Sequence, residues 1–365
     1  MPILWRYLLK SYFQAFLLCV SSFIAVLLVI RFQEIASFAA SGARLEYIGL
    51  FTLYQIPFIL PIAIPISCLI AAMILFQRLS HTQELTALRT CGLGLWPIAY
   101  PLILGGILMS LINFTIASEV APYTRSLAKK MIFEITAENP LALLQKDTLI
   151  KLKNSYIDMK TLRSGKSADE VIFISKQASS DRLGIMTAKH LSVKEDLLLG
   201  KNVSIVSSVD PKFEGYDHLI IENQKTMQTQ SSTLTEHMQS TEWKMSDEYL
   251  PLRGILSKAI VEQSKRKASV SKSAQLEIVR RVTLGLAAFT FTFIGVAFGM
   301  DISRQRRKKG VIWAFALAAF FMVSFVAAKS FRHNVNTASL VYLLPHFVIF
   351  FVCLRSFRSI ARGIE

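Results

Sequence analysis

Apolar blocks long enough to cross a lipid bilayer constrain this fold more than any other feature of the chain. A membrane-spanning helix needs about 20 consecutive apolar residues to cover the hydrocarbon core. A window of about 19 residues finds six such blocks, at roughly 11–30, 49–76, 96–118, 279–300, 311–328 and 338–354. The composition agrees, since 52% of the 365 residues are hydrophobic and only 18% are charged. We predict an α-helical membrane protein with six transmembrane helices in two groups of three.

The polar region between the two groups, residues 119–276, contains no such block and predicts an inserted all-β domain. Short apolar runs at 149–152, 171–174, 203–206 and 219–221 alternate with turn-forming sets at 163–167, 199–202 and 210–211. This spacing is typical of short antiparallel strands, and we expect a β-sandwich or an open β-jellyroll. The stretch 255–275 predicts a helix that leads into the fourth span. The remaining domains are 1–118 and 277–365.

The distribution of Lys and Arg near the spans predicts the orientation, because positive charge in short loops stays on the cytoplasmic side. Twelve such residues flank one side and four flank the other. The first set is Arg6, Lys10, Arg78, Arg89, Arg304, Arg306, Arg307, Lys308, Lys309, Arg355, Arg358 and Arg362, and the second is Arg31, Arg44, Lys329 and Arg332. Both termini and the loops 77–95 and 301–310 are therefore expected in the cytoplasm, with the β-domain outside.

Other classes of protein fit the residues poorly. The net charge of +16 comes from residues flanking the spans and scattered through the middle region, not from a basic stripe with aromatics, which argues against nucleic-acid binding. Cys19, Cys68, Cys91 and Cys353 lie in or beside apolar blocks, so a disulfide framework or a Cys-based metal site is not expected. The first apolar run is longer than a usual signal-peptide core, and we expect it to be an uncleaved span.

Signals of catalysis are weak in this chain. Gly165-Lys166-Ser167 lacks the first glycine of a phosphate-binding loop, since position 160 is Lys160. The six histidines never take the two-His helical spacing of a zinc site, and no nucleophile elbow occurs. An enzyme acting on envelope lipids or sugars would have to use the local acids and bases of the middle region. These are Asp158, Asp169, Glu170, His190 and Glu195.

The stretch HTQELTALRTCGLGLWP, residues 81–97, joins two spans but has the pattern of a short amphipathic helix. Leu85 and Leu88 share a helical face, Glu84 lies in the first turn, where the helix dipole favours a negative charge, and Arg89 follows near the end. Thr82 is suited to cap the N-terminus, and Gly92 stands where the helix would stop. A helix at about 82–92 can dock a cytoplasmic partner or rest on lipid headgroups.

Two spans carry features that affect helix packing. Pro57, Pro61 and Pro65 are spaced four apart in the second span, so each removes a backbone donor on one helical face. Neighbouring helices or water must then satisfy the freed carbonyls, and the bend predicts either a wall beside a cavity or a packing kink. Gly295 and Gly299 form a G-x-x-x-G pair that lets another helix approach closely.

The segment that begins at Ile59, ILPIAIPISCLIAAMILFQRLSHTQELTALRTCGLGLWPI, resembles the lipopolysaccharide-export permease family of the LptF/LptG (YjgP/YjgQ) type. In that family a proline-containing second helix leads into an acidic coupling helix. The resemblance continues in EIVRRVTLGLAAFTFTFIGVAFG at 277–299 and in the layout of three spans, an outside β-domain and three more spans. It therefore covers nearly the full length.

This resemblance implies a non-catalytic permease subunit of an ATP-driven exporter, with ATP bound by a partner and no cofactor in this chain. Members pair with a second, related permease and bind a cytoplasmic ATPase dimer through the coupling helix. They extract lipopolysaccharide from the inner membrane, between the first and fifth helices, and pass it to periplasmic jellyroll proteins. Carried over by position, the coupling residues are Glu84, Leu85, Leu88, Arg89 and Gly92. The segment ENPLALLQ at 138–145 favours the LptF-like paralogue.

Phosphorylated headgroups of such a lipid require cations near the outer membrane face. Arg31, Arg44, Lys329 and Arg332 follow spans on that side and are candidates, with charge-assisted hydrogen bonds of about 1.5–3 kcal/mol each. Ordinary interfacial anchoring is the alternative for each of them. Besides the permease and the enzyme, a third hypothesis is another ABC-type envelope export subunit.

Overall fold

The computed structural model describes residues 3–40, 45–138, 150–152, 155–163, 167–176, 183–194, 197–209, 218–230, 247–264, 268–300, 309–331 and 334–361. By their contacts the residues divide into two compact units. The helical unit comprises residues 1–30, 53–126 and 245–365, and the second unit comprises residues 31–52 and 127–244, which include the inserted sheet. We describe each unit by itself.

Six helices are long and apolar enough to cross a membrane, which confirms the predicted spans. They are α1 (Ile3–Ile30), α3 (Leu45–His81), α5 (Leu95–Thr115) with its continuation, α9 (Ala268–Gly299), α10 (Lys309–Ala328) and α11 (Val335–Ala361). The continuation of α5 is a π-helical turn, η1 (Ile116–Val120), followed by α6 (Ala121–Glu138). Several helices extend beyond the predicted ranges because a hydropathy window detects only their apolar part.

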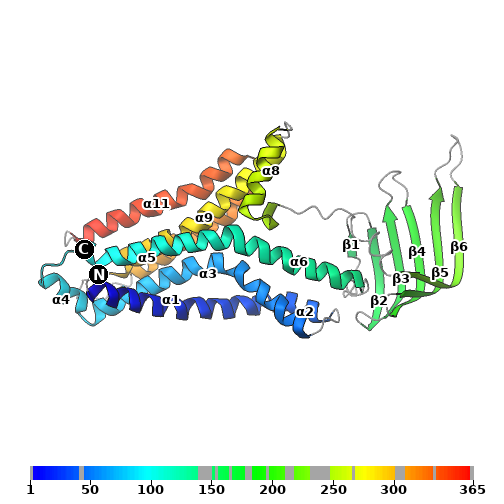
Figure 1. Ribbon diagram of the computed structural model, residues 1–365, viewed down its shortest axis with the longest axis horizontal. Helices are drawn as coiled ribbons and strands as arrows, with labels where there is room; N and C mark the ends of the chain where they lie inside the picture. Colours follow the sequence, from blue (N-terminus) through cyan, green and yellow to red (C-terminus); the bar gives the residue numbers. More distant parts are fainter. Residues whose placement is uncertain are drawn as a thin grey trace. The chain divides into compact units, whose positions relative to one another are not determined.

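Shorter elements connect these spans. They are α2 (Phe32–Ala40), α4 (Glu84–Thr90), η3 (Asp247–Tyr249), α8 (Leu252–Ser264) and η4 (Lys329–Phe331). Helices α8 and α9 occupy most of the stretch 255–275, so the predicted helix before the fourth span is confirmed in the described residues. Figure 1 shows that α4, the start of α1 and the end of α11 lie at the same end of the helical unit. This agrees with the prediction that these parts share one side of the membrane.

Helix α9 is the centre of the helical unit. It contacts α5, α8, α10 and α11, and 72% of its apolar window is buried, whereas only 11% of the window of α1 is buried. One apolar cluster joins α1, α3, α4, α5, α9 and α11, and a second joins α3, α9, α10 and α11. A helix that is apolar on all sides must be surrounded by protein or lipid. Within this chain α9 is surrounded by protein, and α1 leaves most of its surface for lipid or another protein.

The inserted all-β domain is confirmed as one antiparallel sheet of six strands in the order β1-β2-β3-β4-β5-β6. The strands are β1 (Ile150–Leu152), β2 (Ser155–Arg163), β3 (Ser167–Lys176), β4 (Leu183–Lys194), β5 (Leu197–Val209) and β6 (His218–Gln230). Every pairing among the described strands joins sequence neighbours, whereas a jellyroll consists of two sheets with Greek-key connections. The jellyroll topology therefore stays a prediction.

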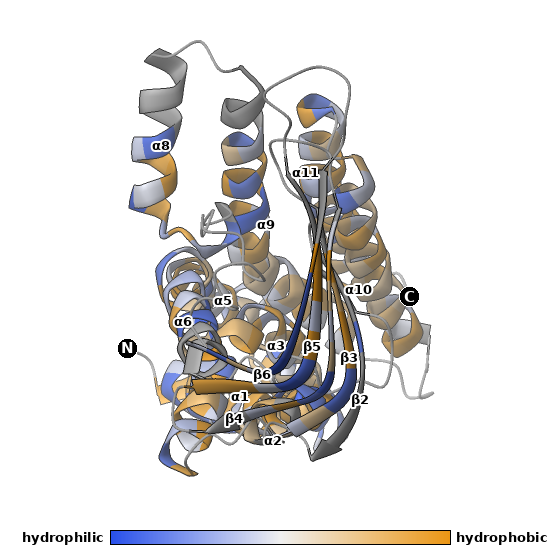
Figure 2. Cartoon of the chain, turned by 90° about the vertical axis from the view of Figure 1, so that its right-hand side faces the viewer, coloured by the Kyte–Doolittle hydropathy of each residue, from blue (hydrophilic) through white to orange (hydrophobic). Residues whose placement is uncertain are grey.

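A bend runs across the sheet through one row of residues. Four residues stand opposite one another in β3 to β6, namely Glu170, Lys189, Asn202 and Lys225. Their neighbours on both sides are paired between the strands, but these four residues are not paired with one another. Glu170 and Asn202 have left-handed backbones, with φ of 52° and 51°, and such residues bend a strand. Figure 2 shows the strands curving along their length.

This bend corrects one prediction. The set at 199–202 was expected to form a turn between strands, but it lies within β5, which continues to Val209. Asn tolerates a positive φ in a turn and in a strand bend alike, so the residue types alone do not separate the two structures. One face of the sheet is apolar and holds a cluster around Val171, Ala188 and Leu198.

Candidate functional site

Helix α4 lies between the spans α3 and α5 and confirms that the link at 81–97 contains a helix. It begins at Glu84, and its N-cap residue is Gln83, one residue after the predicted cap Thr82. Gln83 has a left-handed backbone, with φ of 62°, and its side chain forms no cap hydrogen bond. The predicted capping role of Thr82 is therefore wrong. The Thr82 hydroxyl instead lies within hydrogen-bond distance of Glu84 Oε1, at 2.9 Å.

The C-terminal end of α4 follows the prediction. Gly92 has φ of 83°, a conformation in which a side chain would be strained. Its N–H donates to the carbonyl of Arg89 at 2.9 Å, and the N–H of Leu93 donates to the carbonyl of Leu88 at 3.2 Å. This pair of bonds is a Schellman motif, which satisfies carbonyls that have no partner inside the helix. Gly92 thus ends α4.

The two predicted leucines of α4 face the helical unit. Leu85 is fully buried in the cluster that includes Leu8 of α1, Leu95 of α5 and Phe357 of α11, and Leu88 packs against that cluster. Leu85 is therefore the anchor of α4, and in this chain it does not form part of an exposed surface. The exposed residues of the helix are Thr86, Ala87 and Thr90, and all three have small side chains.

Glu84 is held by a residue that the sequence did not indicate. The hydroxyl of Tyr7 in α1 donates a hydrogen bond to Glu84 Oε2 at 3.1 Å, at an exposed position. The Glu84 carboxylate thus has Thr82 near one oxygen and Tyr7 on the other. Because Tyr7 precedes Glu84 by 77 positions, no local pattern could have identified it.

The prolines of α3 lie within one continuous helix, and a neighbouring helix satisfies one of the carbonyls they free. Pro65 removes the donor that would bond the carbonyl of Pro61, and the side-chain amide of Asn113 in α5 donates to that carbonyl at 3.3 Å. The same amide donates to the carbonyl of Leu284 in α9 at 2.7 Å, so the buried Asn113 links three helices. At least one carbonyl freed by Pro57, Pro61 and Pro65 therefore has a dedicated donor within the chain; whether the prolines form a wall beside a cavity or a packing kink stays a prediction.

Gly295 and Gly299 bring α9 close to α3 within this chain. A Cβ on Gly295 would stand 2.7 Å from the Cβ of Ala72 and 2.7 Å from the carbonyl oxygen of Leu69. A Cβ on Gly299 would stand 3.1 Å from the Cα of Met73. Real Cβ atoms essentially never show the two distances at Gly295, and the distance at Gly299 is tighter than nine in ten real Cβ contacts. The glycine pair therefore serves helix packing inside the chain, as its spacing predicts.

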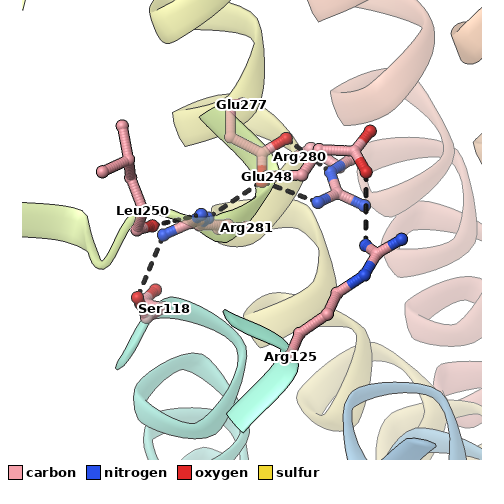
Figure 3. Close-up of polar contacts among 7 residues, drawn as sticks. All are labelled: Ser118, Arg125, Glu248, Leu250, Glu277, Arg280 and Arg281. Atoms are coloured by element: carbon pink, nitrogen blue, oxygen red, sulfur yellow. Dashed lines mark hydrogen bonds and ion pairs between the residues drawn. The ribbon is translucent and has the colours of Figure 1, made fainter. Parts of the chain in front are cut away.

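A buried polar cluster ties the far end of α5 to α9 and to the segment before α8 (Figure 3). Arg281 of α9, which is 1% exposed, donates to Glu277 Oε1 at 3.0 Å, to the carbonyl of Ser118 at 3.0 Å and to the carbonyl of Leu250 at 2.8 Å. We call these four residues the Arg281 joint. Arg280 binds the same Glu277 carboxylate through two further hydrogen bonds, at 2.6 and 2.8 Å.

A second ion pair lies beside this joint. Arg125 of α6 donates to Glu248 at 3.2 Å, and its guanidinium lies over the rings of Phe58 and Tyr249, at 4.6 and 4.9 Å from their centres. Cation–π contacts of this kind stabilise a charge that is partly removed from water. Together with the Arg281 joint, this pair connects η1 and α6 with residues 248–250, as Figure 3 shows.

The candidates for binding a lipid headgroup are only partly described. Arg31 forms an ion pair with Glu34, and Lys329 is exposed in η4, while Arg44 and Arg332 lie outside the described residues. Of the acids and bases considered for an enzyme, His190 Nδ1 lies 2.5 Å from Asp169 at the bend of the sheet. A shallow hollow there is lined by Asp169, Glu170, Lys189, His190, Lys201 and Asn202. Glu195 lies outside the described residues.

Comparison with known proteins places the chain in a family. Residues 6–359 match the profile of the family described as lipopolysaccharide export system permease LptF/LptG. The chain belongs to the LptF/LptG family. A search of curated proteins gives no match. The match covers the six spans, α4 and the inserted sheet, so the chain is a multi-pass membrane protein of the inner membrane and a transport permease of the lipopolysaccharide export system.

Proposed function

We propose that this LptF/LptG permease is the non-catalytic subunit of an ATP-driven exporter and that α4 receives the force of ATP hydrolysis from a cytoplasmic ATPase dimer. In this proposal a second, related six-span permease completes the lipid path, and the chain itself binds neither ATP nor another cofactor. Both termini and α4 lie in the cytoplasm, and the inserted sheet lies in the periplasm. The sheet passes lipopolysaccharide to a periplasmic jellyroll protein that leads toward the outer membrane.

The observation that carries this proposal is the construction of α4. A helix of seven residues is too short to be stable alone, yet this one has a Schellman end at Gly92 and a buried anchor at Leu85. Its outer surface presents the small residues Thr86, Ala87 and Thr90. Small residues let a partner approach the backbone, and the anchor lets a push on the helix reach the spans.

The exposure of the spans supports the proposed entry of lipid between the first and fifth helices. The apolar windows of α1 and α10 are 11% and 28% buried, the two lowest values among the six spans. These helices therefore leave the largest share of their apolar windows for lipid tails or for the second permease. Lys329, at the end of α10, is one exposed cation that would meet a phosphorylated headgroup there.

Affinity purification of the tagged chain in mild detergent tests this function. We expect a cytoplasmic ATPase, a second six-span permease and lipopolysaccharide to co-elute, with the ATPase lost on Glu84→Arg because the charge on the coupling helix is reversed. Glu46→Arg is the matched control, since Glu46 is an exposed acid that, like Glu84, lies in the first turn of a helix. It should leave the ATPase bound.

Glu84→Arg reverses the charge of this residue and also removes its hydrogen bond to Tyr7, and Tyr7→Phe separates these two effects. It removes the hydrogen bond from Tyr7 but keeps the Glu84 charge, so the ATPase should still co-elute. A Glu84→Arg protein that retains the ATPase and transports lipid would remove this role from Glu84. A single chain without ATPase or glycolipid in the unchanged protein would contradict the proposed complex.

A further inference from the structure

Three carbonyls of the helical unit that a proline leaves without a backbone donor accept a hydrogen bond from a side chain of another helix. Pro65 frees the carbonyl of Pro61, and Asn113 donates to it. Pro345 of α11 in the same way frees the carbonyl of Val341, and the hydroxyl of Ser324 in α10 donates to it at 2.9 Å. In both cases a polar side chain of a neighbouring helix replaces the missing N–H.

The Arg281 joint is the third and strongest case. Pro122 is the second residue of α6, and the carbonyl four residues before it belongs to Ser118. Pro122 has no N–H to donate to that carbonyl, and its ring would collide with the carbonyl in a regular α-helix. The helix avoids this collision with the π-turn η1, in which the N–H of Ala121 bonds the carbonyl of Ile116. Arg281 Nη1 then donates to the freed Ser118 carbonyl at 3.0 Å.

The same guanidinium also holds the chain where it returns to the helical unit. Leu250 lies between η3 and α8, and its carbonyl accepts a hydrogen bond from Arg281 Nη2 at 2.8 Å. Ser118 and Leu250 thus belong to the segments through which the chain leaves and re-enters this unit around the inserted residues 127–244. A planar guanidinium, with N–H donors in fixed directions on three nitrogens, suits two carbonyls and a carboxylate at once, whereas a Lys ammonium presents its three donors from a single nitrogen. Glu277 fixes the orientation of that fork through Nε.

We propose that Arg281 is a positioning residue that fastens the outgoing segment at Ser118 and the returning segment at Leu250 to α9, with Pro122 creating one of its two carbonyl acceptors. Because one side chain holds both segments, they move together with α9 during transport. This proposal does not depend on the ATPase or on the role of α4.

Hydrogen exchange measured by mass spectrometry on the full-length protein in detergent tests the proposal. Arg281→Met should speed exchange by about tenfold in two peptides, one covering residues 117–126 and one covering 247–256, because both segments open more often. Arg280→Met is the matched control. It removes an arginine that binds the same carboxylate but should leave both peptides within about twofold of the unchanged protein.

A second change distinguishes positioning from general loss of stability. Adding Pro122→Ala to Arg281→Met supplies an N–H at position 122, which can bond the Ser118 carbonyl in an α-turn. Protection should then return in 117–126 and stay lost in 247–256. Recovery in both peptides or in neither, or unchanged exchange in 247–256 on Arg281→Met alone, would overturn the proposal.

If Arg281→Met does not fold, Arg281→Lys carries the same test. It keeps the positive charge, but a single ammonium group cannot reproduce the fork. Exchange should rise in at least one of the two peptides. Protection equal to that of the unchanged protein in both peptides would contradict the proposal.

Discussion

The Arg281 joint and α4 lie at opposite ends of α5, and the protein holds them in different ways. At the joint, a guanidinium that is 1% exposed makes charge-assisted bonds to three residues from separate segments. At α4, an exposed hydrogen bond of 3.1 Å joins the Tyr7 hydroxyl to the Glu84 carboxylate, and Leu85 is the one buried side chain of the helix. Hydrogen bonds in water contribute little, whereas buried charged groups are costly to disturb.

This difference indicates how a permease can transmit motion. An element that must bind and release a partner needs surface bonds that exchange readily with bonds to that partner. An element that must carry motion onward needs contacts that do not open. The end of α5 next to α4 therefore suits a contact that receives motion from a partner, and the end next to the Arg281 joint suits a fixed connection between segments. The following changes test that distinction in order of decreasing effect.

The largest loss is expected for Arg281→Met. It leaves the buried Ser118 and Leu250 carbonyls without this donor and removes one partner from the buried Glu277 carboxylate. Breaking a buried ion pair costs several kcal/mol, and because Arg280 still neutralises Glu277 we expect about 3 kcal/mol. Chemical denaturation in detergent, followed by tryptophan fluorescence, measures this loss. A loss no larger than that of Tyr7→Phe would show that the two ends are not held differently.

A smaller loss is expected for Asn113→Leu, which removes a neutral donor instead of a charged one. The carbonyls of Pro61 and Leu284 lose a hydrogen bond, at a cost of about 1.5 kcal/mol. Pro65→Ala supplies the missing backbone N–H for Pro61, so it should cost less in the Asn113→Leu protein than in the unchanged protein. The same denaturation assay compares the four proteins of this cycle. If the two losses of stability simply add in the double variant, Asn113 does not act through the Pro61 carbonyl that Pro65 frees.

These two changes also show which part of the structure the sequence could predict. The six spans and the end of α4 at Gly92 depend on local patterns, so hydropathy and a single glycine were sufficient. Proline spacing likewise indicates which carbonyls lose a donor. It does not indicate the donor that replaces it, because Asn113 and Arg281 reach Pro61 and Ser118 from distant parts of the chain.

The errors have local physical causes. The sequence predicts Thr82 as the cap of α4, but Gln83, with a left-handed backbone, occupies that position. Because Gln rarely adopts a positive φ, its residue type does not indicate this conformation. The set at 199–202 predicts a turn, whereas the structure has a strand bend at Asn202, because turns and bends favour the same residue. Leu85 was correctly placed on an apolar face, yet only the packing shows that this face is already covered within the chain.

An intermediate effect at α4 is expected for Gly92→Ala. Gly92 has open space around its Cα, so the cost comes from its φ of 83° and not from a collision. A left-handed alanine costs about 1 kcal/mol, and the Schellman bonds to Leu88 and Arg89 should weaken. Hydrogen exchange in a peptide covering 84–93 should speed up, while the peptide covering 247–256 stays unchanged. Gly49→Ala, a glycine with open space and no positive φ, should cost nothing.

The smallest effect is expected for Tyr7→Phe, which removes only the exposed bond to Glu84. Bonds of this kind contribute about 0.5 kcal/mol or less to stability, so denaturation should barely change. Its effect should instead appear in motion, because this bond joins α4 to α1. Spin labels at Thr86 and on α1 should show a broader distance distribution in Tyr7→Phe than in the unchanged protein. An unchanged distribution would mean that Leu85 alone positions α4, and a stability loss near that of Arg281→Met would contradict the contrast between the two ends of α5.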